Sequence, residues 1–232
     1  MQVAALYDVH GNPPAIDAVL SDVPDDATIL VGGDVAAGPY PAEALERLRA
    51  LGERVVWIRG NADRELHPGE QGLAPADVIG WVRDQLSEEQ VAFLHGLPER
   101  VELDVDGVGR VLFCHATPLN DTDIFLEGTP EERVAPAFAD VTADAVVCGH
   151  THMQFDREVA GIRVVNAGSV GMPYDDAPGA YWLSLGPGVE HRLTPYDETG
   201  LDASSFPGDY FRGGRRSRAE VTAYFEPHTI GA

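Results

Sequence analysis

The chain has 232 residues, of which 44% are hydrophobic, and its 38 acidic residues outnumber its 16 basic ones to give a formal net charge of −22. This length suits a single α/β domain with a sizeable core, and no run approaches the roughly 20 apolar residues that a membrane-spanning helix needs. So acidic a surface disfavours nonspecific binding to nucleic acids and anionic membranes.

The first half of the chain alternates short apolar runs with longer amphipathic segments, which predicts βαβ units. Asn12 and Pro13 are typical of a helix start, because Asn caps helices and Pro is tolerated in the first turn. From residue 1 to 98 we expect strands at 3–7, 28–31 and 54–58 and helices at 13–20, 41–51, 76–86 and 87–94, the last opened by a Ser87–Gln90 capping box.

The second half shows more strand signals and one long polar loop. We expect strands at 99–105, 110–114 and 144–148, a loop at 116–130, a helix at 131–138, and antiparallel strands near 155–166 and 181–193. Residues 1–232 are interpreted as one domain, with 196–232 as a peripheral extension. The extension carries Arg212, Arg215, Arg216 and Arg218, which would form a solvated basic face or a docking site.

The N-terminal sequence and the cysteine content indicate the cellular compartment in which the protein is expected. No basic segment followed by an apolar run opens the chain, so we expect a cytoplasmic protein without a removable signal. Cys114 and Cys148 are too few for a disulfide framework, and both lie in apolar runs. Buried, reduced thiols are therefore expected, with a catalytic thiol as the alternative.

Five polar motifs each follow an apolar strand. Because the carboxyl ends of parallel strands meet at one edge of an α/β sheet, residues distant in sequence would gather there. Glycines beside these motifs would let the backbone approach closely or adopt positive φ. The motifs are Asp8-Val9-His10, Gly32-Gly33-Asp34, Gly60-Asn61-Ala62-Asp63, His115, and Gly149-His150-Thr151-His152.

The residue types in these motifs suit a metal site. Four imidazoles, two carboxylates and one carboxamide form a mixed nitrogen and oxygen set, which is typical of Mn, Fe, Co, Ni or Zn. Taken singly, Asp8 or Asp34 could cap a helix, and His10 or His115 could be a hydrogen-bonded core histidine. A structural account of all five motifs needs separate coincidences, so we favour the metal site.

In this order the motifs resemble those of the calcineurin-like metallophosphoesterase family, whose pattern is DxH, GD, GN, H and GHxH. The likeness is greatest to small bacterial and archaeal phosphodiesterase-like members, which also carry a segment like Gly38-Pro39-Tyr40-Pro41, and it continues through residues 166–171. The resemblance implies an α/β fold, namely a four-layer α/β/β/α sandwich of two β-sheets flanked by helices.

The resemblance also implies a role for each residue. Asp8, His10 and His152 would bind one metal, and Asn61, His115 and His150 a second, with Asp34 bridging the two. The cofactors would be two divalent transition-metal ions, Mn before Fe, Zn, Ni or Co. A metal-bridging hydroxide would attack a small phosphate-ester substrate in line, and phosphodiesters or nucleotide-like esters are the expected substrates. Asp34, Asn61 and His115 would thus be catalytic, and Arg64 could clamp a phosphate oxygen.

One position departs from the family pattern. Many members have His after the GN pair, where it would protonate the leaving oxygen, whereas this chain has Ala62. General acid catalysis typically contributes about 10²–10⁴-fold, so esters with poor leaving groups should be the worst substrates. Asp63, Arg64 and His67 are the nearby candidates to replace the missing acid.

Other activities fit the same motifs. A phosphomonoesterase, a protein phosphatase or a dinucleoside polyphosphate hydrolase would use the same ligands. A noncatalytic scaffold of the same fold, such as the related retromer coat subunit, is the alternative from another class. A scaffold has no need of a complete ligand set, and this chain has all seven ligands, which favours the enzyme.

Overall fold

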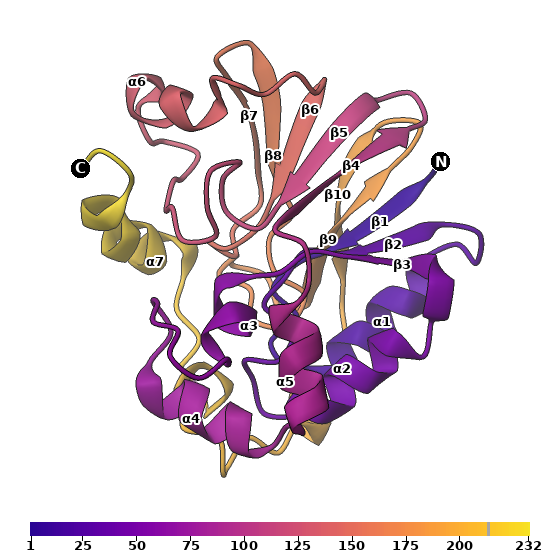
Figure 1. The fold of residues 1–232 in the computed structure, drawn as a ribbon, viewed down its shortest axis with the longest axis vertical. Coiled ribbons are helices and arrows are strands. Elements are labelled where there is room, and N and C mark those ends of the chain that lie inside the picture. The colour runs from indigo at the N-terminus through magenta and orange to yellow at the C-terminus, as the bar shows by residue number, and fades with distance from the viewer. Residues whose placement is uncertain (213) are drawn as a thin grey trace.

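Two five-stranded mixed sheets pack against one another in the computed structural model, which describes residues 1–212 and 214–232 (Figure 1). The first sheet has the order β10-β9-β1-β2-β3 and the second the order β4-β5-β6-β8-β7. The strands are β1 (Val3–Leu6), β2 (Thr28–Val31), β3 (Val55–Trp57), β4 (Arg100–Val105), β5 (Gly109–Cys114), β6 (Ala145–Cys148), β7 (Phe155–Val159), β8 (Ile162–Asn166), β9 (Ala180–Leu185) and β10 (Val189–Thr194).

Each sheet contains three neighbouring strands that run in parallel. In the first sheet β1, β2 and β3 run in parallel, with Val3 paired to Thr28, and β9 joins β1 in the antiparallel sense. In the second sheet β5, β6 and β8 run in parallel, while β4 and β7 add antiparallel edges. All four residues of β1 and of β6 are buried, as expected for strands covered on both faces.

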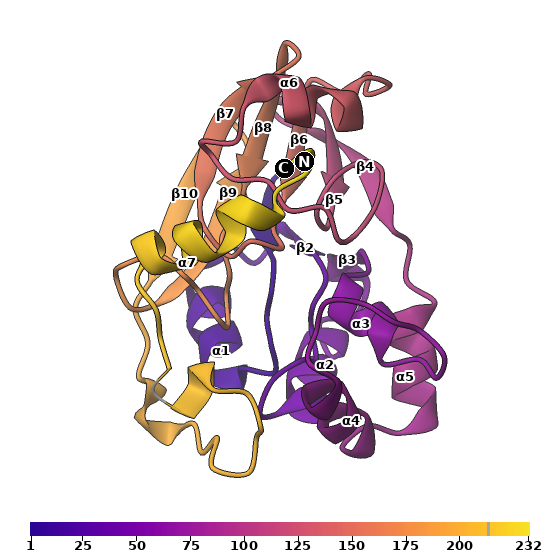
Figure 2. The same ribbon diagram turned by 90° about the vertical axis from the view of Figure 1, so that its left-hand side faces the viewer.

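Helices cover the outer face of each sheet, which completes the four layers (Figure 2). The α-helices are α1 (Pro13–Asp22), α2 (Pro41–Arg49), α3 (Asn61–Glu65), α4 (Ala76–Asp84), α5 (Glu88–His95), α6 (Glu131–Val134) and α7 (Arg218–Phe225). Single 3₁₀ turns lie at Gly52–Arg54, Ala135–Phe138, Glu198–Gly200, Tyr210–Arg212 and Glu226–His228. The expected fold class is confirmed.

Three apolar clusters lie between these layers. One fills the space between the sheets, where Tyr7 and Ile58 meet Phe113 and Val147. A second lies between the first sheet and its helices, and a third packs Phe138 and its neighbours under the second sheet. Within the described residues, no helix is long and apolar enough to cross a membrane.

The expected elements match closely, with differences at their ends. Asn12 accepts a hydrogen bond from the Ala15 amide and opens α1, and Ser87 and Gln90 form the expected capping box at α5. The helix expected at 131–138 changes from α to 3₁₀ at residue 135, where Pro136 lacks the amide that would continue it. In the C-terminal extension, α7 begins at Arg218, behind the capping residue Ser217.

Candidate metal centre

The five polar motifs lie at the carboxyl ends of β1, β2, β3, β5 and β6. These ends belong to two sheets, so the site lies along an edge that both sheets share. Backbone hydrogen bonds join neighbouring motifs there, with Asp8 N donating to Gly33 O at 3.1 Å and Gly149 N to His115 O at 2.9 Å. Neighbouring motifs at the strand ends are thus hydrogen-bonded to one another.

The backbone at this edge is strained. Among the described residues other than glycine, six have positive φ, and only Ala160 lies outside the predicted ligand set. A residue with a Cβ in this region costs roughly 1–2 kcal/mol, and such strain clusters at functional sites. The five predicted ligands with positive φ are Asp8 (φ 52°), His10 (45°), Asp34 (52°), His150 (67°) and His152 (59°).

One group of donors consists of Asp8, His10 and His152, all buried. The Nδ1 atoms of His10 and His152 lie 2.9 and 2.7 Å from the carbonyl oxygens of Ala37 and Met172. A carbonyl oxygen can only accept, so each Nδ1 carries the hydrogen and each neutral ring leaves Nε2 with a free lone pair. The two Nε2 atoms nevertheless face one another at 3.1 Å.

Asp8 completes this first group. Its Oδ1 is buried without a hydrogen-bond partner and lies 3.4 Å from His152 Nε2, while its Oδ2 accepts the His150 amide at 2.9 Å. A buried unpaired carboxylate oxygen and two opposed lone pairs are unfavourable unless a cation lies among them. These residues therefore fit a divalent metal ion.

A second group consists of Asp34, His115 and His150, with Asn61 beside them. His115 Nδ1 donates to Gly32 O at 2.9 Å, which leaves Nε2 directed at Asn61 Oδ1, 3.2 Å away, and at Asp34 Oδ2, 3.5 Å away. The rings of His115 and His150 are 5.1 Å apart. Nitrogen and oxygen donors again converge, as a metal ion requires.

Asp34 lies between the two groups. Its Oδ2 is 3.9 Å from His10 Nε2 and 3.5 Å from His115 Nε2, and its Oδ1 accepts the Ala62 amide at 2.8 Å. This carboxylate is therefore placed to contact ions held by either group. Only glycine at position 60 allows the backbone to lie this close to Asp34, because a Cβ on Gly60 would be 2.2 Å from Asp34 Oδ1.

The charges of the site favour a cation. Burial alone would raise the pKa of Asp34, but His115 and His10 outweigh it and hold that pKa well below its usual range. Burial likewise opposes protonation of His115, yet Asp34 and Asp8 raise its pKa to about 10. For His10, burial and the facing His152 lower the pKa. In the second group, burial lowers the pKa of His150 to about 4, so each group combines anionic oxygens with at least one neutral imidazole.

Two of the candidate proton donors near Ala62 are held by hydrogen bonds, and the third stacks on another histidine. Asp63 is fully buried and accepts the amides of Val35 and Gly60, and burial followed by the nearby Asp34 raises its pKa to about 7. His67 stacks on His95, with ring centroids 4.1 Å apart.

The Arg64 guanidinium is already bound to two carboxylates, so it is not free to bind a phosphate oxygen. Its Nε and Nη2 donate to Asp121 at 2.7 and 3.1 Å, and its Nη1 donates to Glu70 at 3.3 Å and to Gln71 O at 3.0 Å. The Arg64 guanidinium would have to leave these partners before it could bind a phosphate oxygen.

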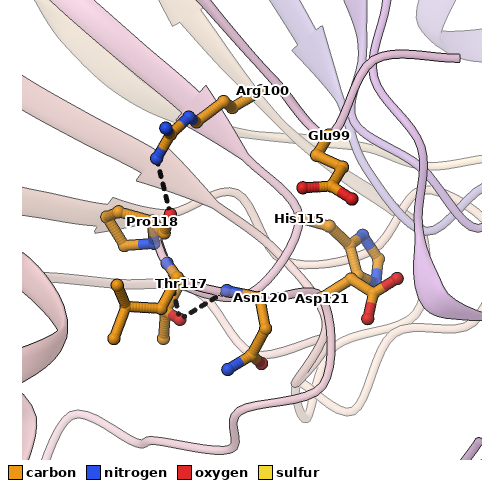
Figure 3. Close-up of a pocket in the computed structure, with 8 residues that line it drawn as sticks. Glu99, Arg100, His115, Thr117, Pro118, Asn120 and Asp121 are labelled. Atoms are coloured by element: carbon orange, nitrogen blue, oxygen red, sulfur yellow. Dashed lines mark hydrogen bonds between the residues drawn. The ribbon is translucent and has the colours of Figure 1, made fainter.

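A pocket opens beside His115 (Figure 3). Polar groups of the loop after β5 line it, and the Arg100 guanidinium closes one side by donating to Pro118 O at 2.8 Å. Asp121, in the polar loop expected at 116–130, lines this pocket and pairs with Arg64. The pocket thus lies beside one member of the second group of donors, His115.

Two further residues contact the predicted ligands, and sequence reasoning missed the first of them, Glu65. Glu65 is buried, and its Oε1 accepts the Asn61 side-chain amide at 2.9 Å, which turns Asn61 Oδ1 toward the site. Tyr174 stacks on His152, with centroids 4.8 Å apart and an interplanar angle of 18°. The only sequence signal for Glu65 was its position four residues after Asn61, one helical turn on.

The cysteines lie apart from this chemistry. Cys114 and Cys148 are free and buried, and both belong to the apolar cluster under the second sheet. Burial raises the pKa of Cys114 to about 12 and that of Cys148 well above its usual value. Both therefore remain protonated thiols at neutral pH, which disfavours the catalytic alternative.

Comparison with known proteins agrees with the architecture and the motifs. Residues 1–185 match the model of the calcineurin-like phosphoesterase superfamily domain. The chain is 27% identical over 201 residues to an uncharacterised protein of Methanocaldococcus jannaschii, covering 75% of this chain and 77% of that protein. It is 25% identical over 198 residues to the phosphodiesterase YfcE of Escherichia coli K12, covering 79% and 86%.

A solved structure extends the likeness over nearly the whole chain. The crystal structure of a metallophosphoesterase from Sphaerobacter thermophilus superposes with a TM-score of 0.70 at 25% sequence identity. The superposition covers 96% of this chain and 98% of that one.

Proposed function

The chain belongs to the calcineurin-like phosphoesterase superfamily, and we propose that it hydrolyses phosphodiesters or nucleotide-like phosphate esters with the help of two divalent transition-metal ions. The opposed Nε2 atoms of His10 and His152, 3.1 Å apart, carry this proposal, because two acceptors in that position need a cation. The relative named as a phosphodiesterase supports diesters as the substrate class.

The seven predicted ligands would hold the ions in two neighbouring positions. Asp8, His10 and His152 would hold one ion, Asn61, His115 and His150 the other, and Asp34 would contact both. Bound there, the ions would acidify a water molecule and neutralise charge on the attacking and leaving oxygens. The nitrogen and oxygen donors contain no thiolate, so we propose Mn²⁺, with Fe, Zn, Ni and Co as alternatives.

The chain itself keeps these donors in place before any substrate binds. Carbonyl oxygens of Ala37, Met172 and Gly32 fix the rings of His10, His152 and His115, and backbone amides fix one oxygen of each carboxylate. Preorganised donors of this kind need no rearrangement during the reaction. The pocket beside His115 would receive one ester group, with Arg100 and Asn120 at its wall.

The test is metal analysis combined with hydrolysis. Protein stripped with a chelator and reloaded with Mn²⁺ should hold two ions per chain and cleave bis(p-nitrophenyl) phosphate. Asp34→Asn should lower kcat/KM by more than about 100-fold, beyond the loss expected for a residue that only supports a ligand. Asp25→Asn, a change at an exposed position, is the matched control. One ion or none with activity intact would contradict the dinuclear model.

A noncatalytic scaffold is the second candidate, and the absence of an acid at Ala62 favours it. The same experiment separates the two. A protein that holds two ions but cleaves no diester, monoester or nucleotide in a broad panel would be a metal-binding scaffold.

A further inference from the structure

A third group of metal-ligating side chains lies outside the two groups described above. His67, Glu70 and His95 each offer one donor atom, and these atoms all lie within 4.8 Å of one another. His67 and Glu70 belong to the loop between α3 and α4, whereas His95 is the last residue of α5. Both views show α3 and α5 side by side (Figures 1 and 2).

The backbone around this group is held on both sides. Hydrogen bonds from His67 N to Arg64 O at 3.1 Å and from Glu70 N to His67 O at 3.2 Å extend the chain in tight turns, so both side chains lie near the end of α3. On the other side, the Arg59 guanidinium donates to His95 O at 2.7 Å and fixes the end of α5. The backbone therefore brings the three side chains together in the absence of a bound ion.

The donors themselves are available. The rings of His67 and His95 stack at 4.1 Å, and neither ring makes a hydrogen bond to another described residue. Glu70 Oε1 lies 3.6 Å from His95 Nε2. Its Oε2 faces Arg64, whose charge Asp121 already balances through two hydrogen bonds, so Oε1 is left for another cation.

We propose that His67, Glu70 and His95 form a third metal site, specific for Zn²⁺ and chemically similar ions, that ties the loop between α3 and α4 to the end of α5. Two imidazoles and one carboxylate are a ligand set of open zinc sites, which keep a water molecule at the fourth position. A tetrahedral ion would need its donors about 3.3 Å apart, given metal–ligand distances near 2.0–2.1 Å. Exposed side chains such as His67 and Glu70 can move that far.

The site is distinct from the dinuclear one but linked to it. Glu70 contacts Arg64, and Arg64 contacts Asp121, which lines the pocket beside His115. A Zn²⁺ ion on Glu70 Oε1 would leave Oε2 on Arg64 and so hold this bridge in place. The net charge of −22 would favour the approach of the cation.

The test counts Zn²⁺ ions and follows the loop directly. Elemental analysis and calorimetry on the full chain should give one more Zn²⁺ per chain for the wild type than for His67→Ala or His95→Ala. His228→Ala removes an exposed histidine outside the group and should bind Zn²⁺ like the wild type. The affinity of the extra ion should fall by more than about 100-fold in either site variant, since even supporting residues are worth 10–100-fold.

A protease provides the second readout. Glutamate-specific cleavage after Glu70 should slow when Zn²⁺ is added to the wild type or to His228→Ala, and should stay unchanged in His95→Ala. Equal Zn²⁺ stoichiometry in all four proteins, or equal protection of the loop in His95→Ala, would overturn the proposal. Asp34→Asn should still bind the extra Zn²⁺ ion at His67, Glu70 and His95. A failure of the dinuclear model would therefore be distinguishable from a failure of this third site.

Discussion

At the scale of single residues, we expect Ala62 to influence which substrates react. Its side chain brings no proton to the site, Asp63 and Arg64 are held by hydrogen bonds, and the His67 ring stacks on His95. The wild type should therefore prefer esters whose leaving group needs little protonation, such as aryl diesters.

Ala62→His should help alkyl esters more than aryl esters, because a localised charge on the departing oxygen benefits most from a proton. Rates of the wild type and the variant on a series of matched leaving groups provide the measurement. A flat dependence of the wild-type rate on leaving-group pKa would sink the missing-acid interpretation. If Ala62 only keeps the cleft roomy, the variant would lose activity on bulky diesters and gain none elsewhere.

Glu65 should control the second metal through Asn61. Its Oε1 accepts both the Asn61 amide and the Leu73 amide, and its Oε2 accepts the Ala74 amide. In Glu65→Gln, the NH₂ group of the glutamine would face one of these N–H donors and could not accept its hydrogen bond. We therefore expect the affinity for the second ion to fall about 10–100-fold. Competition with a chromogenic chelator measures this loss. Glu158→Gln, at an exposed position, is the control, and an unchanged second affinity in Glu65→Gln would contradict the role.

At the scale of elements, α7 supports the site from a distance. Arg218, its first residue, pairs with the buried Asp175 and donates to Gln154 O at 2.9 Å, and Phe225 packs near Tyr174, the residue stacked on His152. The C-terminal basic residues are thus not all solvated, although the side chain of Arg212 lies outside the described residues.

Arg218→Ala should leave Asp175 buried without its cation. We expect a loss of about 1–3 kcal/mol in the free energy of unfolding, which is the usual cost of an unsatisfied buried group. Chemical denaturation measures it, with Arg163→Ala as the control for an exposed ion pair. A variant that matched this control in stability would show that α7 is held by its apolar contacts alone.

The elements themselves were largely predictable, and the contacts between them were not. Apolar runs and capping residues such as Asn12 and Ser87 give the strands and helices, since these signals are local. The order of the motifs predicted which residues converge on the strand ends. Tyr174 on His152 and Asp121 on Arg64 depend on how distant loops pack, which no local pattern encodes.

At the scale of the whole molecule, the net charge opposes the proposed substrates. Even two divalent ions would reduce it only from −22 to about −18, so an anionic phosphodiester meets long-range repulsion outside the pocket. Added salt screens this repulsion, because the Debye length falls from about 30 Å at 0.01 M to 10 Å at 0.1 M.

We therefore expect kcat/KM for an anionic diester to rise as ionic strength increases over this range, at fixed metal saturation. Steady-state kinetics in a monovalent salt measures the effect, and an uncharged aryl ester is the control for direct effects of salt on the enzyme. A fall in kcat/KM would mean that local positive charge, rather than the net charge, governs the approach of substrate.

With metal bound as proposed, the backbone strain at five of the predicted ligands would make the folded population depend on the supply of metal. At roughly 1–2 kcal/mol each, their backbone strain sums to about 5–10 kcal/mol, comparable with the 5–15 kcal/mol by which ordinary domains are stable. A ligand that binds only the folded state adds RT ln(1 + [L]/Kd), or about 2.7 kcal/mol for each ion present at 100 times its Kd. Ions held as proposed would thus act as stabilisers as well as cofactors. In a cell short of transition metals, the metal-free chain would unfold more often and be degraded sooner, so the amount of this protein would follow metal availability without any change in its synthesis.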